Sequence, residues 1–144
     1  MKAPFLSICI PSYNRPTELN DLLTSIDCSP ADVEVVICED LAPRRADVRS
    51  IVQAFSALSA YTTHYHENSK NFGFDGNLRQ LIEYATGEYL VFMGDDDLFI
   101  PGALGQFISF LKKHRNYPYV LRSYITKHPD GRTEHFRYLP NSQV

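Results

Sequence analysis

Three consecutive aspartates, Asp95, Asp96 and Asp97, interrupt an otherwise apolar segment, EYLVFMGDDDLFIPGAL (residues 88–104). Adjacent carboxylates in a partly buried site repel one another, and at least one resists ionisation unless a cation is present. Mg²⁺ or Mn²⁺ would resolve this, because both bind carboxylate and phosphate oxygens and need few protein ligands when a diphosphate completes the shell. The cluster therefore predicts a nucleoside-diphosphate ligand whose leaving phosphate the metal stabilises. A solvated loop ahead of a helix N-terminus, which also tolerates negative charge, remains the alternative.

Two further apolar stretches end in polar residues. Residues 5–10 (FLSICI) lead into PSYNR, and residues 33–38 (VEVVIC) lead into Glu39 and Asp40. Ligands of open α/β sheets bind beyond the carboxyl ends of the strands, so these residues and the aspartates are expected at one edge. A carboxylate of the Glu39–Asp40 pair either accepts a hydrogen bond from a base or ribose there or simply caps the following segment.

The spacing of apolar residues predicts strands at 5–10, 33–38, 61–67, 89–93 and 119–126, with 134–139 returning as a hairpin partner. Helices are expected from Thr17, over 48–58, around 78–85 with Gly87 as the C-terminal cap, and from Pro101. Residues 68–77 are expected to form a polar loop. This alternation predicts an α/β fold, a three-layer α/β/α sandwich around a mostly parallel, doubly wound, Rossmann-like sheet.

The composition narrows the class of protein. The 144 residues are 44% hydrophobic with a net charge of −3, which suits one globular domain over residues 1–144 and no nucleic-acid partner. No leader and no run of about 20 apolar residues is evident, which favours a cytoplasmic protein. The sequence has no P-loop, no Gly-x-Gly-x-x-Gly after the first strand and no Gly-x-Ser-x-Gly elbow.

Three segments, in the same order and spacing as in the family, resemble the N-terminal, nucleotide-sugar-binding part of family 2 inverting glycosyltransferases, which have the GT-A fold. SICIPSYNR resembles the opening strand and turn of that family, and VEVVICED resembles its second strand with a terminal acidic residue. NFGFDGNLRQLIEYATGEYLVFMGDDD resembles its Asn-x-Gly to Asp-x-Asp block. The resemblance covers roughly residues 5–112 and implies a metal-dependent transferase that acts on a nucleoside-diphosphate sugar.

The resemblance also implies roles for the matched positions. Residues implied to bind the nucleotide sugar are Pro11, Ser12, Tyr13, Asn14, Asp40 (base), Asn71, Gly73, Asn77, Arg79 and Asp95. Asp96 and Asp97 are implied to bind Mn²⁺ or Mg²⁺.

Two positions depart from the family pattern. Leu78 stands where relatives have an arginine, so Arg79 is only a substitute, and Gly94 stands at the first aspartate of Asp-x-Asp. Asp96 then matches the second, metal-binding aspartate.

The resemblance gives no catalytic residue within this chain. The general base of the family is an Asp or Glu in the second half of its domain, so it is expected beyond Val144, and residues 1–144 are expected to bind donor but transfer sugar poorly. The acceptor is expected to be a saccharide or lipid-linked molecule of bacterial surface polysaccharide synthesis. A noncatalytic nucleotide-binding domain is the alternative. Further expectations are association with the inner membrane face through other regions and self-association through an exposed sheet edge.

Overall fold

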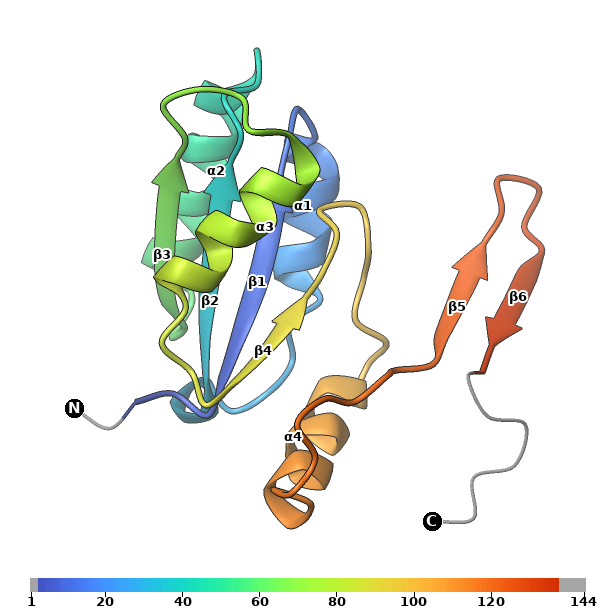
Figure 1. Cartoon of the computed structure of the whole chain (residues 1–144). Helices are drawn as coiled ribbons and strands as arrows, with labels where there is room; N and C mark the ends of the chain where they lie inside the picture. Colours follow the sequence, from blue (N-terminus) through green and yellow to red (C-terminus); the bar gives the residue numbers. More distant parts are fainter. Residues whose placement is uncertain (1–2, 138–144) are drawn as a thin grey trace. The chain divides into compact units, whose positions relative to one another are not determined.

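The computed structural model describes residues 3–137, and its elements follow the predicted order (Figure 1). It divides into two compact units, Met1–Phe110 and Leu111–Val144. The elements are β1 (Leu6–Ser12), α1 (Pro16–Thr24), a 3₁₀ turn η1 (Pro30–Asp32), β2 (Val33–Glu39), α2 (Arg45–Leu58), β3 (Thr62–Glu67), α3 (Gly73–Tyr84), β4 (Tyr89–Phe92), α4 (Ala103–Lys113), β5 (Tyr124–Lys127) and β6 (Thr133–Phe136).

The first unit is built on a parallel sheet of four strands in the order β3-β2-β1-β4. The helix α3 covers one face, and α1 and α2 cover the other (Figure 1). Every residue of β1 and β2 is buried, which explains why both strands are nearly continuous apolar runs rather than alternating ones. This arrangement confirms the predicted α/β fold with helices on both faces of a parallel sheet.

The helix α3 begins earlier than the sequence pattern indicated. Residues 73–77, expected as loop, form its first turn. The backbone N–H of Gly73 donates to Oδ1 of Asn71 at 2.9 Å, and Gly73 has φ +72°, so an Asx-type turn leads directly into the helix. Asn77 and Leu81 then face the sheet as the buried residues of α3.

Two predicted helix boundaries were wrong. Gly87 does not cap α3, which ends at Tyr84 with an extended Ala85 after it. Instead Gly87 packs on β1, where a Cβ would lie 2.6 Å from Oγ and 2.7 Å from N of Ser7. Pro101 precedes α4 rather than beginning it, because Gly102 turns with φ +76° and donates its N–H to Oδ2 of Asp27 at 2.7 Å.

A buried carboxylate fixes the connection between α3 and β4. Glu34 on β2 accepts hydrogen bonds from Oγ of Ser7 at 2.6 Å, N of Thr86 at 2.6 Å and Oγ1 of Thr86 at 2.9 Å. Burial alone would raise the pKa of Glu34, but these hydrogen bonds outweigh it and hold the pKa below its ordinary value. The network ties residues 86–87 to the first two strands.

The second unit contains the predicted hairpin. β5 and β6 pair antiparallel, from Tyr124 opposite Phe136 to Lys127 opposite Thr133. The HPDGRT turn is confirmed by Gly131 at φ +86° and by the His128 N–H, which donates to the Arg132 carbonyl at 2.9 Å. The strand predicted at 119–126 is shorter, since only residues from Tyr124 onward have a paired strand in the described part of this unit. Residues 138–139 of the predicted return strand lie outside the described residues.

Candidate functional site

The carboxyl ends of β1 and β4 meet through one buried carboxylate. Asp95 follows β4 and is 5% exposed. Its Oδ2 accepts the backbone N–H of Tyr13 at 3.0 Å, and its Oδ1 accepts from Nη1 of Arg15 at 3.2 Å. Burial raises the pKa of Asp95, although both donors favour its ionised form. Asp95 therefore joins the loop after β1 to the aspartate turn, as the sheet-edge argument anticipated.

Asp96 and Asp97 turn their carboxylates toward Gly94. A Cβ on Gly94 would lie 3.0 Å from Oδ1 of Asp96 and 3.1 Å from Oδ2 of Asp97, so the missing side chain leaves room for both groups. Both aspartates are exposed, unlike Asp95. Two oxygens converging on one small space suit a hard divalent cation whose remaining ligands are phosphates and water.

The described residues contain no group of three or more His, Cys, Asp or Glu side chains that could hold a metal ion by themselves. A metal here would therefore be held weakly by two carboxylates and water, and more tightly once a bound ligand adds its oxygens. That fits the expectation of a diphosphate, because Mg²⁺ in phosphate sites is commonly held by one or two carboxylates plus substrate phosphates.

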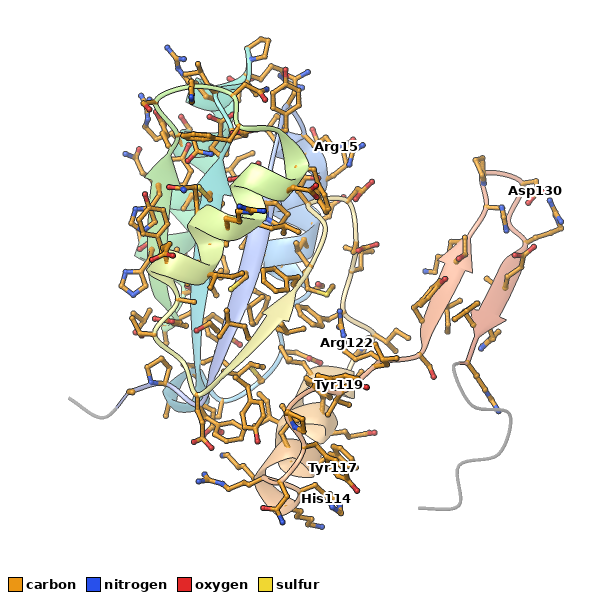
Figure 2. The ribbon with its side chains drawn as sticks, in the orientation of Figure 1. Arg15, His114, Tyr117, Tyr119, Arg122 and Asp130 are labelled. Atoms are coloured by element: carbon orange, nitrogen blue, oxygen red, sulfur yellow. The ribbon has the colours of Figure 1, made fainter. Side chains whose placement is uncertain are left out.

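Arg15 has a role at this turn that the sequence reasoning missed. Its Nη1 lies 2.7 Å from Oδ2 of Asp96 as well as 3.2 Å from Oδ1 of Asp95. The charge of Asp96, then the hydrogen bond and charge of Asp95, raises the pKa of Arg15. Figure 2 shows Arg15 at the carboxyl end of β1, on the loop that leads into α1. The signal was available, since three adjacent carboxylates require a cation and Arg15 stands in the PSYNR turn assigned to the same edge.

Asp40 lies in a second polar network beside β2. Its Oδ1 accepts from Nδ2 of Asn68 and from the backbone N–H of Phe72, each at 2.8 Å. Nδ2 of Asn68 also donates to Oδ1 of Asn77 at 3.1 Å, and Nδ2 of Asn77 donates to the Cys38 carbonyl at 2.9 Å. Asp40, Asn68 and Asn77 are all buried. The network holds Asp40 in one orientation and anchors the loop that begins α3.

Glu39, the other acidic residue at the end of β2, has a local structural role. Its Oε1 and Oε2 accept the backbone N–H groups of Ala42 and Leu41 at 2.7 and 3.0 Å. Burial raises the pKa of Glu39 even with these two donors. The acidic residue of this pair that caps the following segment is therefore Glu39.

The last residue of β1 carries a hydroxyl without a partner. Ser12 is 1% exposed, and its Oγ is buried with no hydrogen-bond partner in the described structure. The next residues, Tyr13 and Asn14, are exposed, and Asn14 adopts a left-handed conformation with φ 60°, which asparagine tolerates better than most residues. Pro11 is buried at the end of β1. An unpaired buried hydroxyl is costly in a folded protein, so Ser12 is a natural position for a ligand contact.

The other predicted binding residues are placed differently. Asn71 and Gly73 lie exposed at the start of α3, close in sequence to Phe72, which donates to Asp40. Asn77 belongs to the buried network, and Arg79 is exposed on α3. Because residues two apart on a helix do not share a face, Arg79 lies away from the side on which Asn77 meets the sheet. Their contacts with a nucleotide stay predictions.

The family model of glycosyl transferase family 2 matches residues 7–142. The chain belongs to glycosyl transferase family 2. It is 27% identical over 118 residues to the GalNAc(5)-diNAcBac-PP-undecaprenol beta-1,3-glucosyltransferase of Campylobacter jejuni, covering 81% of this chain and 37% of that protein. It is 28% identical over 109 residues to abequosyltransferase RfbV of Salmonella typhimurium, covering 74% of this chain and 32% of that one. The chain thus spans about a third of the length of these relatives.

Solved structures show the same fold. TarS of S. aureus superposes with a TM-score of 0.69 at 22% identity, covering 84% of this chain and 20% of TarS. The mannosyltransferase PcManGT of Pyrobaculum calidifontis, in complex with GDP-Man and Mn²⁺, superposes with a TM-score of 0.61 at 21% identity, covering 69% of this chain and 29% of that one. The predicted GT-A architecture is confirmed. Within the described residues, no helix is both long enough and apolar enough to span a membrane.

Proposed function

We propose that this chain binds a nucleoside-diphosphate sugar at the carboxyl edge of its sheet and provides the donor-binding part of a glycosyltransferase. The observation that carries the proposal is the contact of Asp95 with Tyr13 and Arg15, which joins the loop after β1 to the aspartate turn. Family membership gives the reaction class. A structure of TarS contains UDP-GlcNAc, which supports a nucleotide sugar as the ligand.

The diphosphate end of the donor belongs at the aspartate turn. Asp96 and Asp97 would hold Mn²⁺ or Mg²⁺, and the Mn²⁺ present with GDP-Man in PcManGT supports this assignment. When bound, the metal supplies Lewis-acid stabilisation of the charge that develops on the leaving diphosphate. Asp95 keeps the turn fixed against Tyr13, so that both aspartates face one space beside Gly94.

The nucleoside end belongs at the loops after β1 and β2. Asp40, oriented by Asn68 and Phe72, would accept a hydrogen bond from the base. Ser12 offers a buried hydroxyl that has no internal partner, and Tyr13 offers an exposed ring beside it. Asn71 and Gly73 would border the nucleotide from the start of α3, and Asn14 would do so from the turn after β1.

The acceptor is proposed to be a saccharide, either free or lipid-linked. The name of the Campylobacter relative includes undecaprenol, and another relative from Escherichia coli, 24% identical over 110 residues, is named for a diphosphoundecaprenol acceptor. The undecaprenol in these names supports a lipid-linked acceptor, and we propose a role in bacterial surface polysaccharide synthesis at the cytoplasmic face of a membrane. The general base that activates the acceptor hydroxyl is proposed to lie outside residues 1–144.

Titration calorimetry of the 144-residue chain tests the proposal. UDP, GDP, CDP and dTDP are each titrated with and without Mn²⁺. At least one is expected to bind in a metal-dependent manner and to lose that binding in Asp96→Ala. Asp47→Ala, which removes an exposed aspartate paired with Arg44 on α2, is the control and should bind normally. Tight binding that ignores Mn²⁺ and Asp96 would favour a noncatalytic nucleotide-binding domain, and no binding would contradict the proposal.

A further inference from the structure

In the metal-free chain, Arg15 supplies the positive charge beside the carboxylates of Asp95 and Asp96. A single nitrogen, Nη1, lies 3.2 Å from Oδ1 of Asp95 and 2.7 Å from Oδ2 of Asp96. Asp95 is buried and Asp96 stands next to it, so without a positive charge their mutual repulsion would oppose ionisation. Arg15 thus neutralises the carboxylates that a divalent cation would otherwise neutralise.

The contact of Arg15 with Asp96 is easier to break than its contact with Asp95. The side chain of Asp95 is 7% exposed and also accepts the Tyr13 N–H, so its position is fixed. The side chains of Arg15 and Asp96 are 50% and 52% exposed, and an ion pair between exposed groups contributes little. Asp96 can therefore exchange Arg15 for another cation at small cost, while the contact with Asp95 persists.

The backbone holds Arg15 in this place independently of the ion pair. Arg15 is the N-cap residue of α1, and its carbonyl accepts the N–H of Leu19 at 3.0 Å. The left-handed Asn14 before it and the buried Pro16 after it fix the direction of the chain. A guanidinium released from Asp96 would stay within the site, with several N–H donors free for other oxygens.

Building on the proposed function, we propose that Arg15 is an internal counter-ion that the divalent metal replaces at Asp96, after which Arg15, still held by Asp95, donates to the diphosphate of the donor. Arg15 therefore lowers the affinity for the free metal ion and raises the affinity for the metal–nucleotide complex. It competes with the free metal ion, because both are cations at Asp96. It supports the metal–nucleotide complex, because the diphosphate brings negative charge that a guanidinium binds well.

The test compares Mn²⁺ alone with UDP plus Mn²⁺ by calorimetry, using the full chain and Arg15→Gln. The variant is expected to bind Mn²⁺ alone about threefold to tenfold more tightly and UDP plus Mn²⁺ weaker by a similar factor. Arg15→Lys, which keeps the charge but lacks the planar fork, should bind Mn²⁺ like the wild type and UDP plus Mn²⁺ with intermediate affinity. Arg132→Gln is the control, because it removes a similarly exposed, ion-paired arginine from the β5–β6 hairpin.

Opposite signs for the two ligands support the proposal, since a merely structural role would weaken both. Weaker or unchanged Mn²⁺ binding in Arg15→Gln overturns it, as does a failure of Mn²⁺ to bind either protein. Unchanged UDP affinity overturns the diphosphate contact. UDP is replaced by GDP, CDP or dTDP where only that nucleotide binds the wild type. If none of the four binds in the presence of Mn²⁺, the proposed function fails, and the Mn²⁺-only comparison still decides whether Arg15 is the counter-ion.

A second measurement does not depend on how the variants fold. In the wild type labelled with ¹⁵N-arginine, addition of Mg²⁺ alone should shift the side-chain signal of Arg15 as it leaves Asp96. The signal of Arg49, which binds Glu67 through two hydrogen bonds of 2.7 and 2.8 Å, should stay in place. An Arg15 signal that does not move with Mg²⁺ would overturn the exchange.

Discussion

The backbone N–H of Tyr13 donates to Oδ2 of Asp95 at 3.0 Å, across 82 residues of sequence. This bond makes the first aspartate of the cluster a structural tie between two strand ends and leaves Asp96 and Asp97 exposed. Because Oδ1 of Asp95 also accepts from Arg15, both of its oxygens are already engaged within the chain. The three adjacent carboxylates therefore have different roles, which their shared residue type conceals.

Replacement of Asp95 should destabilise the fold more than replacement of its exposed neighbour. Asp95→Ala leaves the Tyr13 N–H unpaired at a partly buried position and is expected to lower the free energy of unfolding by about 1–3 kcal/mol. Asp95→Asn, which keeps an acceptor and removes a buried charge, should cost less. Asp97→Ala should stay within about 0.5 kcal/mol of the wild type. Urea denaturation measures all three, and equal losses for Asp95→Ala and Asp97→Ala would contradict this division of roles.

Two buried serines on β1 provide a matched comparison. Ser7 donates to Glu34 and accepts the Gly87 N–H at 2.8 Å, whereas Oγ of Ser12 has no partner in the described structure. Ser7→Ala should lower the free energy of unfolding by about 1–3 kcal/mol, and Ser12→Ala should leave it unchanged or slightly higher.

The nucleotide affinities of these variants should show the reverse order. If the Ser12 hydroxyl forms a hydrogen bond with the nucleotide, Ser12→Ala should weaken binding of UDP or GDP. Ser7→Ala should bind the nucleotide normally as long as the variant is folded. Urea denaturation ranks the stabilities of the two variants, and calorimetry ranks their nucleotide affinities. A Ser12→Ala variant that is destabilised yet binds normally would contradict the role assigned to this hydroxyl.

Glu34 should make stability depend on pH in a known direction. Its pKa in the folded chain lies below its ordinary value of 4.5. The stability it contributes is therefore fully present above pH 4.5 and is lost as the pH falls through the lower, folded-state pKa. Glu34→Gln should thus be less stable than the wild type at neutral pH, by about 1.5–3 kcal/mol, with a difference that shrinks on acidification.

Unfolding free energies between about pH 7 and about pH 3.5 check this dependence. Glu83→Gln, an exposed change on α3, is the control and should follow the wild type throughout. A constant difference between Glu34→Gln and the wild type over the whole range would show that the Glu34 charge is not the cause.

The departure from the Asp-x-Asp pattern, Gly94, leaves space for the carboxylates of Asp96 and Asp97. A Cβ there would press on the carboxylates of Asp96 and Asp97, but these are ends of exposed side chains that can move. Gly94→Ala should therefore change the free energy of unfolding by less than about 1 kcal/mol and weaken binding of Mn²⁺ with UDP. Gly105→Ala is the control, because its Cβ meets nothing within 4 Å inside α4 and should slightly stabilise the chain. Normal metal binding in Gly94→Ala would refute the idea that both aspartates need this space.

The sequence was sufficient for the fold because the apolar runs of β1 and β2 are long and periodic helices separate the strands. Parallel strands share a carboxyl edge, so the grouping of Ser12, Asp40 and the aspartates followed from element order alone. Helix boundaries were predicted wrongly where a single hydrogen bond or a single close contact determines where the helix begins or ends. Examples are the Asx turn of Asn71 that extends α3 to Gly73, and the packing of Gly87 on Ser7.

The roles of individual site residues were harder to predict. Nothing in the letters DDD indicates that Asp95 is buried while Asp96 and Asp97 are exposed. Arg15 was placed at the correct edge without a role, because its pairing depends on the turn geometry around Asn14. Asn68 was not singled out, since its hydrogen bond to Asp40 joins residues 28 apart in the sequence.

The location of the metal–nucleotide complex is the most direct test of the account. Mn²⁺ is paramagnetic, so in ¹⁵N-labelled chain with UDP, or GDP where UDP does not bind, it should broaden the amide signals of Tyr13, Asp96 and Asp97. The signal of Glu34, near the amino end of β2, should be much less affected, and Asp96→Ala should remove the selective broadening. Broadening centred elsewhere, or unchanged by Asp96→Ala, would contradict a donor site at the carboxyl edge of this sheet.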